Sequence, residues 1–298
     1  MTYVFLLIFV IQSGFAQLED KNFWKPSDSL NKARRNAVAI TGTGLAAASL
    51  IALNALWYDD FERSSFHTLD DTNEWFQMDK YGHVFSSYQL GRLGAESLNW
   101  SGVQKKDQRI YGAGMGLAFL TTVEIFDGFS EEWGFSWSDF GANVLGTGIY
   151  VGQELLWNEQ RMSIKYSFHR TKYAPMRPDK LGENLLQEMF KDYNGQTYWL
   201  SINLDSFFKE ANLPEWLNFA VGIGADGMLT GINETNNEFG LQDRYRQFYL
   251  SLDIDLSRIE TKSHFLKTVF SVVNVLKIPF PTLELNVNKK SVFHLFYH

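Results

Sequence analysis

The spacing of hydrophobic positions changes from helical to strand-like near residue 160. Before that point, apolar residues recur with the period of an α-helix over 79–98, 108–128 and 137–157. An earlier segment, 36–58, contains no charged residue and is long enough to cross the core of a bilayer. Because a helix that is apolar on every side has to be covered, this segment is expected either to contact a membrane, which we favour, or to form the centre of a helical bundle.

Beyond Trp157, apolar and polar residues alternate, and a period of two predicts β-strands with one apolar face. The predicted strands are 162–168, 198–204, 219–229, 248–256 and 283–287. Further helices are expected near 182–193 and 263–276. The expected fold class is therefore α+β, with a membrane-associated bundle of about four helices at 36–158 followed by a β-rich antiparallel unit at 159–298.

The N-terminal residues have the pattern of a secretory signal peptide. An apolar run at 4–11 leads to small residues and a candidate cleavage point between Ala16 and Gln17. We therefore expect residues 1–16 to be removed, residues 17–35 to form a polar lead-in, and the mature protein to be exported to the cell envelope. The alternative is that the apolar run stays in place as a membrane anchor.

Net charge and cysteine content narrow the classes of function. A net charge of −7 argues against nucleic acid as a partner, because phosphate binding relies on clustered Lys and Arg. Because the sequence contains no Cys, we expect no disulfide, thiolate metal site, Cys nucleophile or lipoprotein anchor. The sequence patterns of nucleotide-binding loops and of serine-hydrolase nucleophile elbows are also missing.

The three helical segments carry ionisable or amide side chains near one end. Such groups are costly in membrane-like helices, so they are functional-site candidates by default. In the first and third helices these residues lie four positions apart and share a helix face. We expect the helices to converge on one binding site, which shields the buried charges by pairing them or by binding a metal. The expected site residues are Asp79, Lys80, His83, Glu124, Asp139 and Asn143.

Two charged residues in the first of these helices are expected to lie outside the site. Arg92 and Glu96 project from the opposite side of the helix, and their spacing of four residues lets them pair with each other. The position of Asp127, near the end of the second helix, is left open.

Each candidate site residue also has a purely structural interpretation. Asp79 is a candidate N-cap, and the S-x-x-D spacing of Ser136 and Asp139 fits a capping box. His83 is alternatively a hydrogen-bonded core residue, and Glu124 a residue that faces water at a helix end.

The motifs in this region carry a resemblance. The sequence DKxxH at 79–83, then Glu124, then GFSWSDFGANVLGTGIY at 134–150 resemble the YfiM-like family of uncharacterised bacterial envelope proteins. The layout is more distantly similar to the VanZ-like membrane proteins. The resemblance covers about 75–157 and implies an envelope protein, but no established reaction.

Three functions from different classes fit these features. The first is an envelope protein whose polar site binds a lipid head group or an envelope partner, with Lys80 and Arg92 meeting phosphate. The second is a metal-assisted or acid–base hydrolase of an envelope lipid. Its candidate catalytic residues and ligands for a divalent metal such as Zn²⁺ or Mn²⁺ are His83, Glu124 and Asp139. The third is an outer-membrane β-barrel component. We rank them in that order.

Overall fold

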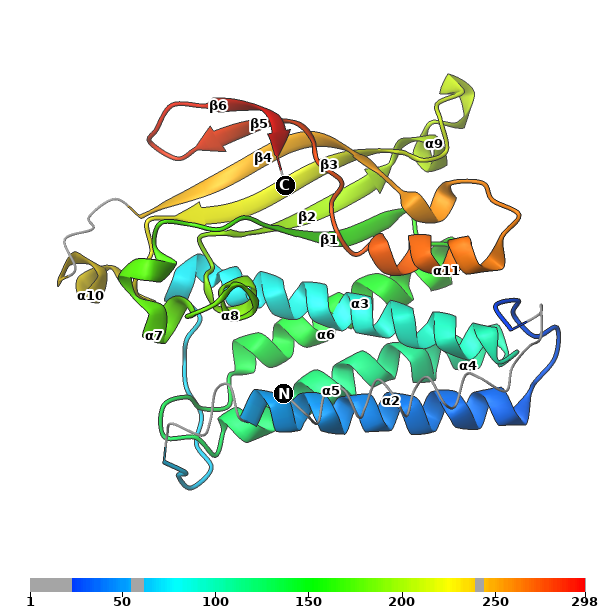
Figure 1. Ribbon diagram of the computed structural model, residues 1–298, viewed down its shortest axis with the longest axis horizontal. Helices are drawn as coiled ribbons and strands as arrows, with labels where there is room; N and C mark the ends of the chain where they lie inside the picture. The colour runs from blue at the N-terminus through cyan, green and yellow to red at the C-terminus, as the bar shows by residue number, and fades with distance from the viewer. Residues whose placement is uncertain (1–22, 55–61, 239–243, 298) are drawn as a thin grey trace.

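The computed structural model describes residues 23–54, 62–238 and 244–297. The predicted signal peptide and its cleavage after Ala16 lie outside these residues. Helices form one side of the described structure and a β-sheet forms the other (Figure 1). The α+β fold class predicted from the change of period is therefore confirmed.

Four helices make up most of the helical half, and three of them match the predicted segments within a few residues. They are α2 (Lys32–Leu53), α3 (Met78–Trp100), α5 (Ala113–Asp127) and α6 (Trp137–Leu156). The short α4 (Lys105–Asp107) and the π-helical turn η3 (Gln108–Gly112) lead into α5. The central helix is α3, which packs against α5, α6 and the first two strands of the sheet.

Glycines set how closely the helices of this half approach one another. A Cβ atom on Gly116 of α5 would lie only 2.9 Å from the backbone nitrogen of Gly91 on α3, so neither helix has room for a larger side chain there. Gly146 of α6 is pressed in the same way against the backbone of Val84 on α3. These two contacts hold the three helices at backbone distance, and they bring the polar side chains near one end of each helix together.

The alternative considered for segment 36–58, a place at the centre of the bundle, is wrong, and residues 55–58 of the segment lie outside the described residues. Its helix, α2, begins at Lys32, within the expected polar lead-in, and none of its residues is buried. Figure 1 shows α2 on the outer side of the helical half, away from the sheet. Its many small residues form few contacts, and α3 takes the centre instead. Of the described helices, only α2 is long and apolar enough to cross a membrane, so membrane contact stays a prediction.

Six strands form one antiparallel sheet in chain order. They are β1 (Met162–Phe168), β2 (Gln196–Asn203), β3 (Leu217–Asp226), β4 (Tyr245–Ile254), β5 (Phe280–Asn286) and β6 (Val292–Tyr297). The first five coincide with predicted strands. β6 was not predicted, because its sequence VFHLFY is apolar at nearly every position and does not alternate.

Short helices connect the strands. They are α7 (Pro178–Leu181), α8 (Leu185–Lys191), α9 (Leu204–Phe207), α10 (Asn233–Glu238) and α11 (His264–Val273). α8 and α11 confirm the helices predicted near 182–193 and 263–276. The chain passes from α6 to β1 where the period changes, and the division into separate domains at that point stays a prediction.

The sheet buries its polar face and exposes its apolar face, which is the reverse of the arrangement in most soluble proteins. On β4, Leu250 and Leu252 are exposed to solvent, whereas Ser251 and Asp253, which alternate with them, are buried. The sheet curls around its polar face, so that Tyr297 of β6 lies 2.9 Å, oxygen to oxygen, from the hydroxyl of Thr197 on β2. The interior of the curled sheet is therefore polar and aromatic, and its outer face is apolar.

The helical half covers only part of this apolar outer face. Phe85 of α3 packs against Tyr166 of β1 and Tyr198 of β2. Tyr88, fully buried on α3, donates a hydrogen bond to the carbonyl of Met162 at 3.0 Å. The outer face of β3–β6 extends beyond this contact and is exposed.

Candidate metal-binding site

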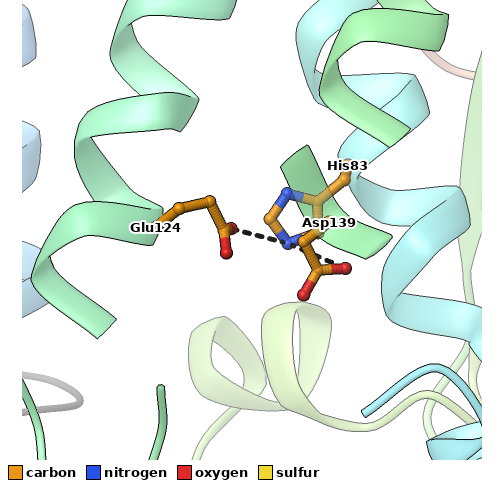
Figure 2. Close-up of side chains that lie close together, drawn as sticks. All are labelled: His83, Glu124 and Asp139. Carbon is orange, nitrogen blue, oxygen red and sulfur yellow. Dashed lines mark ion pairs between the residues drawn. The ribbon is translucent and has the colours of Figure 1, made fainter. Parts of the chain in front are cut away.

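His83 is the meeting point of three helices. Its Nδ1 lies 3.0 Å from Oδ1 of Asn143 on α6. Its Nε2 faces Glu124 of α5, 3.6 Å from Oε1, and Asp139 of α6, 3.9 Å from Oδ1 (Figure 2). The prediction that α3, α5 and α6 bring these four residues together is confirmed in space. Their roles in binding, catalysis or metal ligation stay predictions.

Glu124 is buried at the end of α5, with only 1% of its surface exposed. Its Oε2 accepts a long hydrogen bond of 3.4 Å from the backbone nitrogen of Ser136. Its Oε1, the atom facing His83, has no hydrogen-bond partner within the described part of the chain. Burial, followed by the charges of Asp139 and Asp127, raises the pKa of Glu124 to about 9. Without a further cation, this carboxyl group is therefore protonated at neutral pH.

Lys80 lies at the centre of a second cluster, beside the first. Its Nζ is 2.6 Å from Oδ2 of Asp71, 2.9 Å from Oδ2 of Asp79 and 2.9 Å from Oδ1 of Asp139. Although burial acts in the opposite direction, Asp79 and Asp139 raise the pKa of the Lys80 ammonium, which stays charged. Three carboxylates surround this one ammonium, and the predicted role of Lys80 as a phosphate contact stays a prediction.

Asp139 belongs to both clusters. Its Oδ1 lies 2.9 Å from Nζ of Lys80 and 3.9 Å from Nε2 of His83. Burial and the neighbouring Asp79 raise the pKa of Asp139 to about 6, against the opposing effects of His83 and Lys80. The carboxylate that links the two clusters is therefore incompletely neutralised by the protein itself.

Asp71 was missed by the sequence analysis. It lies in the segment before α3 and accepts hydrogen bonds from the hydroxyls of Ser136 at 2.7 Å and Ser138 at 3.0 Å. Burial opposes ionisation, but the hydrogen bonds from Lys80 and Ser136 dominate and lower the pKa of Asp71. No periodic pattern includes this residue, and its place depends on how the segment folds back over α6.

The backbone just before α3 is strained. Trp75, Phe76 and Gln77 all adopt positive φ, between 48° and 57°, which costs free energy for residues other than Gly. This turn delivers Asp79 to the first turn of α3 rather than to its N-cap, so the N-cap interpretation of Asp79 is wrong. Strain of this kind gathers at functional sites, and here it sets the position of Asp79 and Lys80.

The capping box predicted at Ser136 is half correct. The Ser136 hydroxyl accepts a hydrogen bond from the backbone nitrogen of Asp139 at 3.1 Å, so Ser136 is the N-cap of α6. The backbone nitrogen of Ser136 donates to Glu124, and not to the carboxylate of Asp139 as a capping box requires. The Asp139 side chain is thereby left for Lys80 and His83.

Arg92 and Glu96 lie outside the site, as predicted. Arg92 donates to Glu96 at 2.6 Å and to the backbone carbonyl of Ser271 at 3.0 Å. These contacts engage the guanidinium group, and the predicted role of Arg92 as a phosphate contact stays a prediction.

Two sets of three side chains bring ligand atoms within 4.8 Å of one another: His83, Glu124 and Asp139, and Asp71, Asp79 and Asp139. The second set already surrounds the ammonium of Lys80, whose single positive charge offsets part of its negative charge. In the first set, Oε1 of Glu124 has no hydrogen-bond partner among the described residues and faces the imidazole Nε2 of His83, and nitrogen and oxygen are ligands of Zn²⁺ and Mn²⁺. The first set is therefore the candidate metal-binding site.

Comparison with known proteins gives one match. Residues 67–153 match the model of a family described as "Predicted periplasmic lipoprotein (DUF2279)". The match supports an envelope protein. It spans both clusters, from Asp71 to Asn143, but well under half of the chain. The YfiM-like and VanZ-like assignments stay predictions, and the 298 residues contain no Cys to which a lipid could be attached. No curated protein and no solved structure shows a significant match to the chain.

Proposed function

We propose that this chain is a cell-envelope protein whose helical half binds a divalent cation at His83, Glu124 and Asp139. One observation carries the proposal: a buried carboxylate oxygen of Glu124, which no described residue hydrogen-bonds, faces the Nε2 atom of His83 at 3.6 Å. Buried polar atoms are rarely left without a partner, and a missing ion is one explanation for such an atom.

The contacts around His83 support a ligand role. With Nδ1 donating its proton to the Asn143 carbonyl oxygen at 3.0 Å, the lone pair of Nε2 points towards the two carboxylates. Metal-binding histidines are commonly oriented in this way by a hydrogen bond from the other ring nitrogen. A cation there would also replace the proton on Glu124 and balance the charge that Lys80 leaves uncompensated on Asp139.

A bound cation would give the site a means of holding an anionic group. Lys80 and Arg92 are committed to other partners, so a phosphate or carboxylate would have to meet the metal itself. Three protein ligands leave at least one coordination position open. We propose that this position receives an oxygen of a lipid head group or of an envelope partner.

The same open position favours a second candidate function, metal-assisted hydrolysis of an envelope lipid. Zn²⁺ sites with three protein ligands and one water are typical of hydrolases. Glu124 and Asp139, as carboxylate ligands of the metal, would then lie beside the activated water.

Zinc titration of the full chain by calorimetry tests the proposal. We expect one Zn²⁺ per chain for the wild type, and binding at least ten-fold weaker for His83→Ala and Glu124→Gln, because each variant removes one ligand. The matched control is His264→Ala, which removes a histidine at the start of α11. Equal zinc affinity in all four proteins would contradict the proposal.

A further inference from the structure

A groove at one end of the strands contains positively charged side chains beside aromatic rings. It has a volume of about 380 Å³ and lies where the start of β4 and the β5–β6 turn meet the segment before α3. Its lining includes the cations Arg244, Arg246 and Lys289 and the rings of Phe76 and Tyr245. We call it the basic groove. No Asp or Glu is among the described residues that line it.

Stacking holds the cations of the basic groove in place. The guanidinium carbons of Arg244 and Arg246 lie 4.9 and 5.2 Å from the centroid of the Phe76 ring, and Nζ of Lys289 lies 4.0 Å from that of Tyr245. Arg246 also donates a hydrogen bond to Gln77. Cations stacked on aromatic rings keep their charge while their side chains are restrained, so the groove is prepared to receive an anion.

The basic groove opens onto the apolar outer face of the sheet. Val287 lines the groove and is exposed, and the apolar residues continue from there across β5, β4 and β3. Val221, Leu250, Leu283 and Phe293 are successive partners in the strand register and form one exposed row across four strands. A second row contains Phe248 and its partner Leu285. We call these two rows the apolar face.

The opposite surface of the same strands shows that this exposure is built into the sheet. The residues that alternate with the apolar face, such as Ser251, Asp253 and Glu284, are buried and hydrogen-bonded. Polar side chains inside and apolar side chains outside are the pattern of strands that face lipid. The apolar face offers no side chain that can hydrogen-bond, whereas protein–protein interfaces typically form about one hydrogen bond per 100–200 Å².

We propose that the basic groove and the apolar face together bind an anionic phospholipid at a bilayer surface. The groove receives the phosphate of the head group, and the acyl chains lie against the apolar face. An anionic head joined to apolar chains matches the arrangement of a cationic groove beside an apolar surface, and free phosphate would use only the first of the two. This site is separate from the proposed metal site and does not depend on it.

The experiment uses flotation of the full chain with phosphatidylcholine vesicles, with and without phosphatidylglycerol. We expect tighter binding when phosphatidylglycerol is present. Arg246→Gln combined with Lys289→Gln should abolish that increment, a loss on the order of ten-fold, since each cation near an anionic surface contributes appreciably. The matched control, Lys106→Gln combined with Lys262→Gln, removes two exposed cations elsewhere and should retain the increment.

Two further measurements test the role of the apolar face and the binding of free phosphate separately. Leu250→Ser combined with Leu283→Ser should weaken binding to both kinds of vesicle, because it removes apolar contact only. Inorganic phosphate, titrated against the full chain without vesicles, should bind far more weakly than phosphatidylglycerol vesicles. If unfolding curves show that the Arg246 and Lys289 double variant is not folded, Lys289→Gln combined with Lys290→Gln replaces it.

The proposal is overturned if the two vesicle compositions bind equally, if the groove variant keeps the increment, or if the apolar variant binds as the wild type does. Phosphate binding as tight as vesicle binding would also overturn it. Zinc titration of the groove variant should match the wild type, so failure of the lipid site can be told from failure of the metal site.

Discussion

A lysine pairs with three carboxylates in the helical half and with one carboxylate in the sheet, and the two clusters differ in how completely their atoms are paired. In the sheet, Lys165 and Asp253 have no exposed surface, and their charged atoms lie 2.8 Å apart. Lys165 also donates to the carbonyl of Ile254 and to Asn274, while Asp253 accepts from Ser201 and from the backbone of Ile278. Both charges are therefore matched by neighbours of this chain.

In the helical cluster, the charged and polar atoms are not all paired in this way. Lys80 faces three carboxylates, and next to them Oε1 of Glu124 and Nδ2 of Asn143 have no hydrogen-bond partner within the described structure. A buried ion pair with all its hydrogen bonds is a structural element, whereas unpaired polar atoms call for another explanation. The comparison indicates a structural role for the sheet cluster and supports the proposal that the helical cluster binds a ligand.

The largest expected effect on stability comes from breaking the sheet cluster. Asp253→Asn leaves Lys165 buried without a counter-charge and should lower the free energy of unfolding by about 3–5 kcal/mol. Urea denaturation measures this loss. Asp205→Asn is the control. Asp205 is itself buried, but its partner Lys209 is exposed, so breaking this pair should cost at most about 1 kcal/mol. Equal losses in the two variants would contradict a structural role specific to the buried pair.

Zinc should stabilise the folded chain through the helical cluster. At a free concentration one hundred times its dissociation constant, a ligand adds about 2.7 kcal/mol to the free energy of unfolding. We expect this gain in the wild type and in Asp205→Asn, and no gain in His83→Ala. Thermal unfolding with and without Zn²⁺ measures it, and a gain that persists in His83→Ala would place the metal elsewhere.

Asn143 should tune the metal site without being a ligand. Asn143→Leu removes the hydrogen bond that orients His83, and loss of such an outer contact typically weakens metal binding by about ten-fold or more. One Zn²⁺ per chain should still bind at saturation. If calorimetry instead gives the wild-type affinity, Asn143 does not orient the imidazole.

The free energy of unfolding of the metal-free protein should depend on pH because the pKa of Glu124 is raised. Its pKa is about 9 in the folded chain against 4.5 for an ordinary Glu. Between these pH values the unfolded chain loses this proton and the folded chain keeps it, so the group lowers stability as pH rises. The slope is on the order of 1 kcal/mol per pH unit.

Glu124→Gln cannot ionise and should lack this contribution. Its stability relative to the wild type should therefore increase from pH 5 to pH 8 in the presence of a chelator, by about 1 kcal/mol per pH unit. A constant difference across that range would mean that Glu124 ionises in the fold as it does in water.

The convergence of α3, α5 and α6 was predictable because isolated charges beside long apolar runs have to find partners. Helical spacing predicted that Asp79 and His83 share one face of α3 and that Asp139 and Asn143 share one face of α6. The place of Asp71 in the site could not be predicted, because a residue in an irregular segment has no periodic signal. The place of α2 could not be predicted either, since an uncharged helix is consistent with both a central and a peripheral position.

The strands teach a similar lesson. Alternation located β1 to β5, because a period of two marks a strand whichever face is buried. It could not tell that the polar face, with Ser251 and Asp253, turns inward, because that depends on how the sheet curls and what covers it. β6 was missed since its outward and inward residues are nearly all apolar.

X-ray absorption at the zinc edge tests the central claim most directly. Full-length protein loaded with one Zn²⁺ should show one imidazole nitrogen at about 2.0–2.1 Å together with carboxylate oxygens and no sulfur. His83→Ala should remove the imidazole signal, while Asp205→Asn should leave the spectrum unchanged. Zinc that fails to bind, or that keeps the same imidazole signal in His83→Ala, would contradict a metal site built from His83, Glu124 and Asp139.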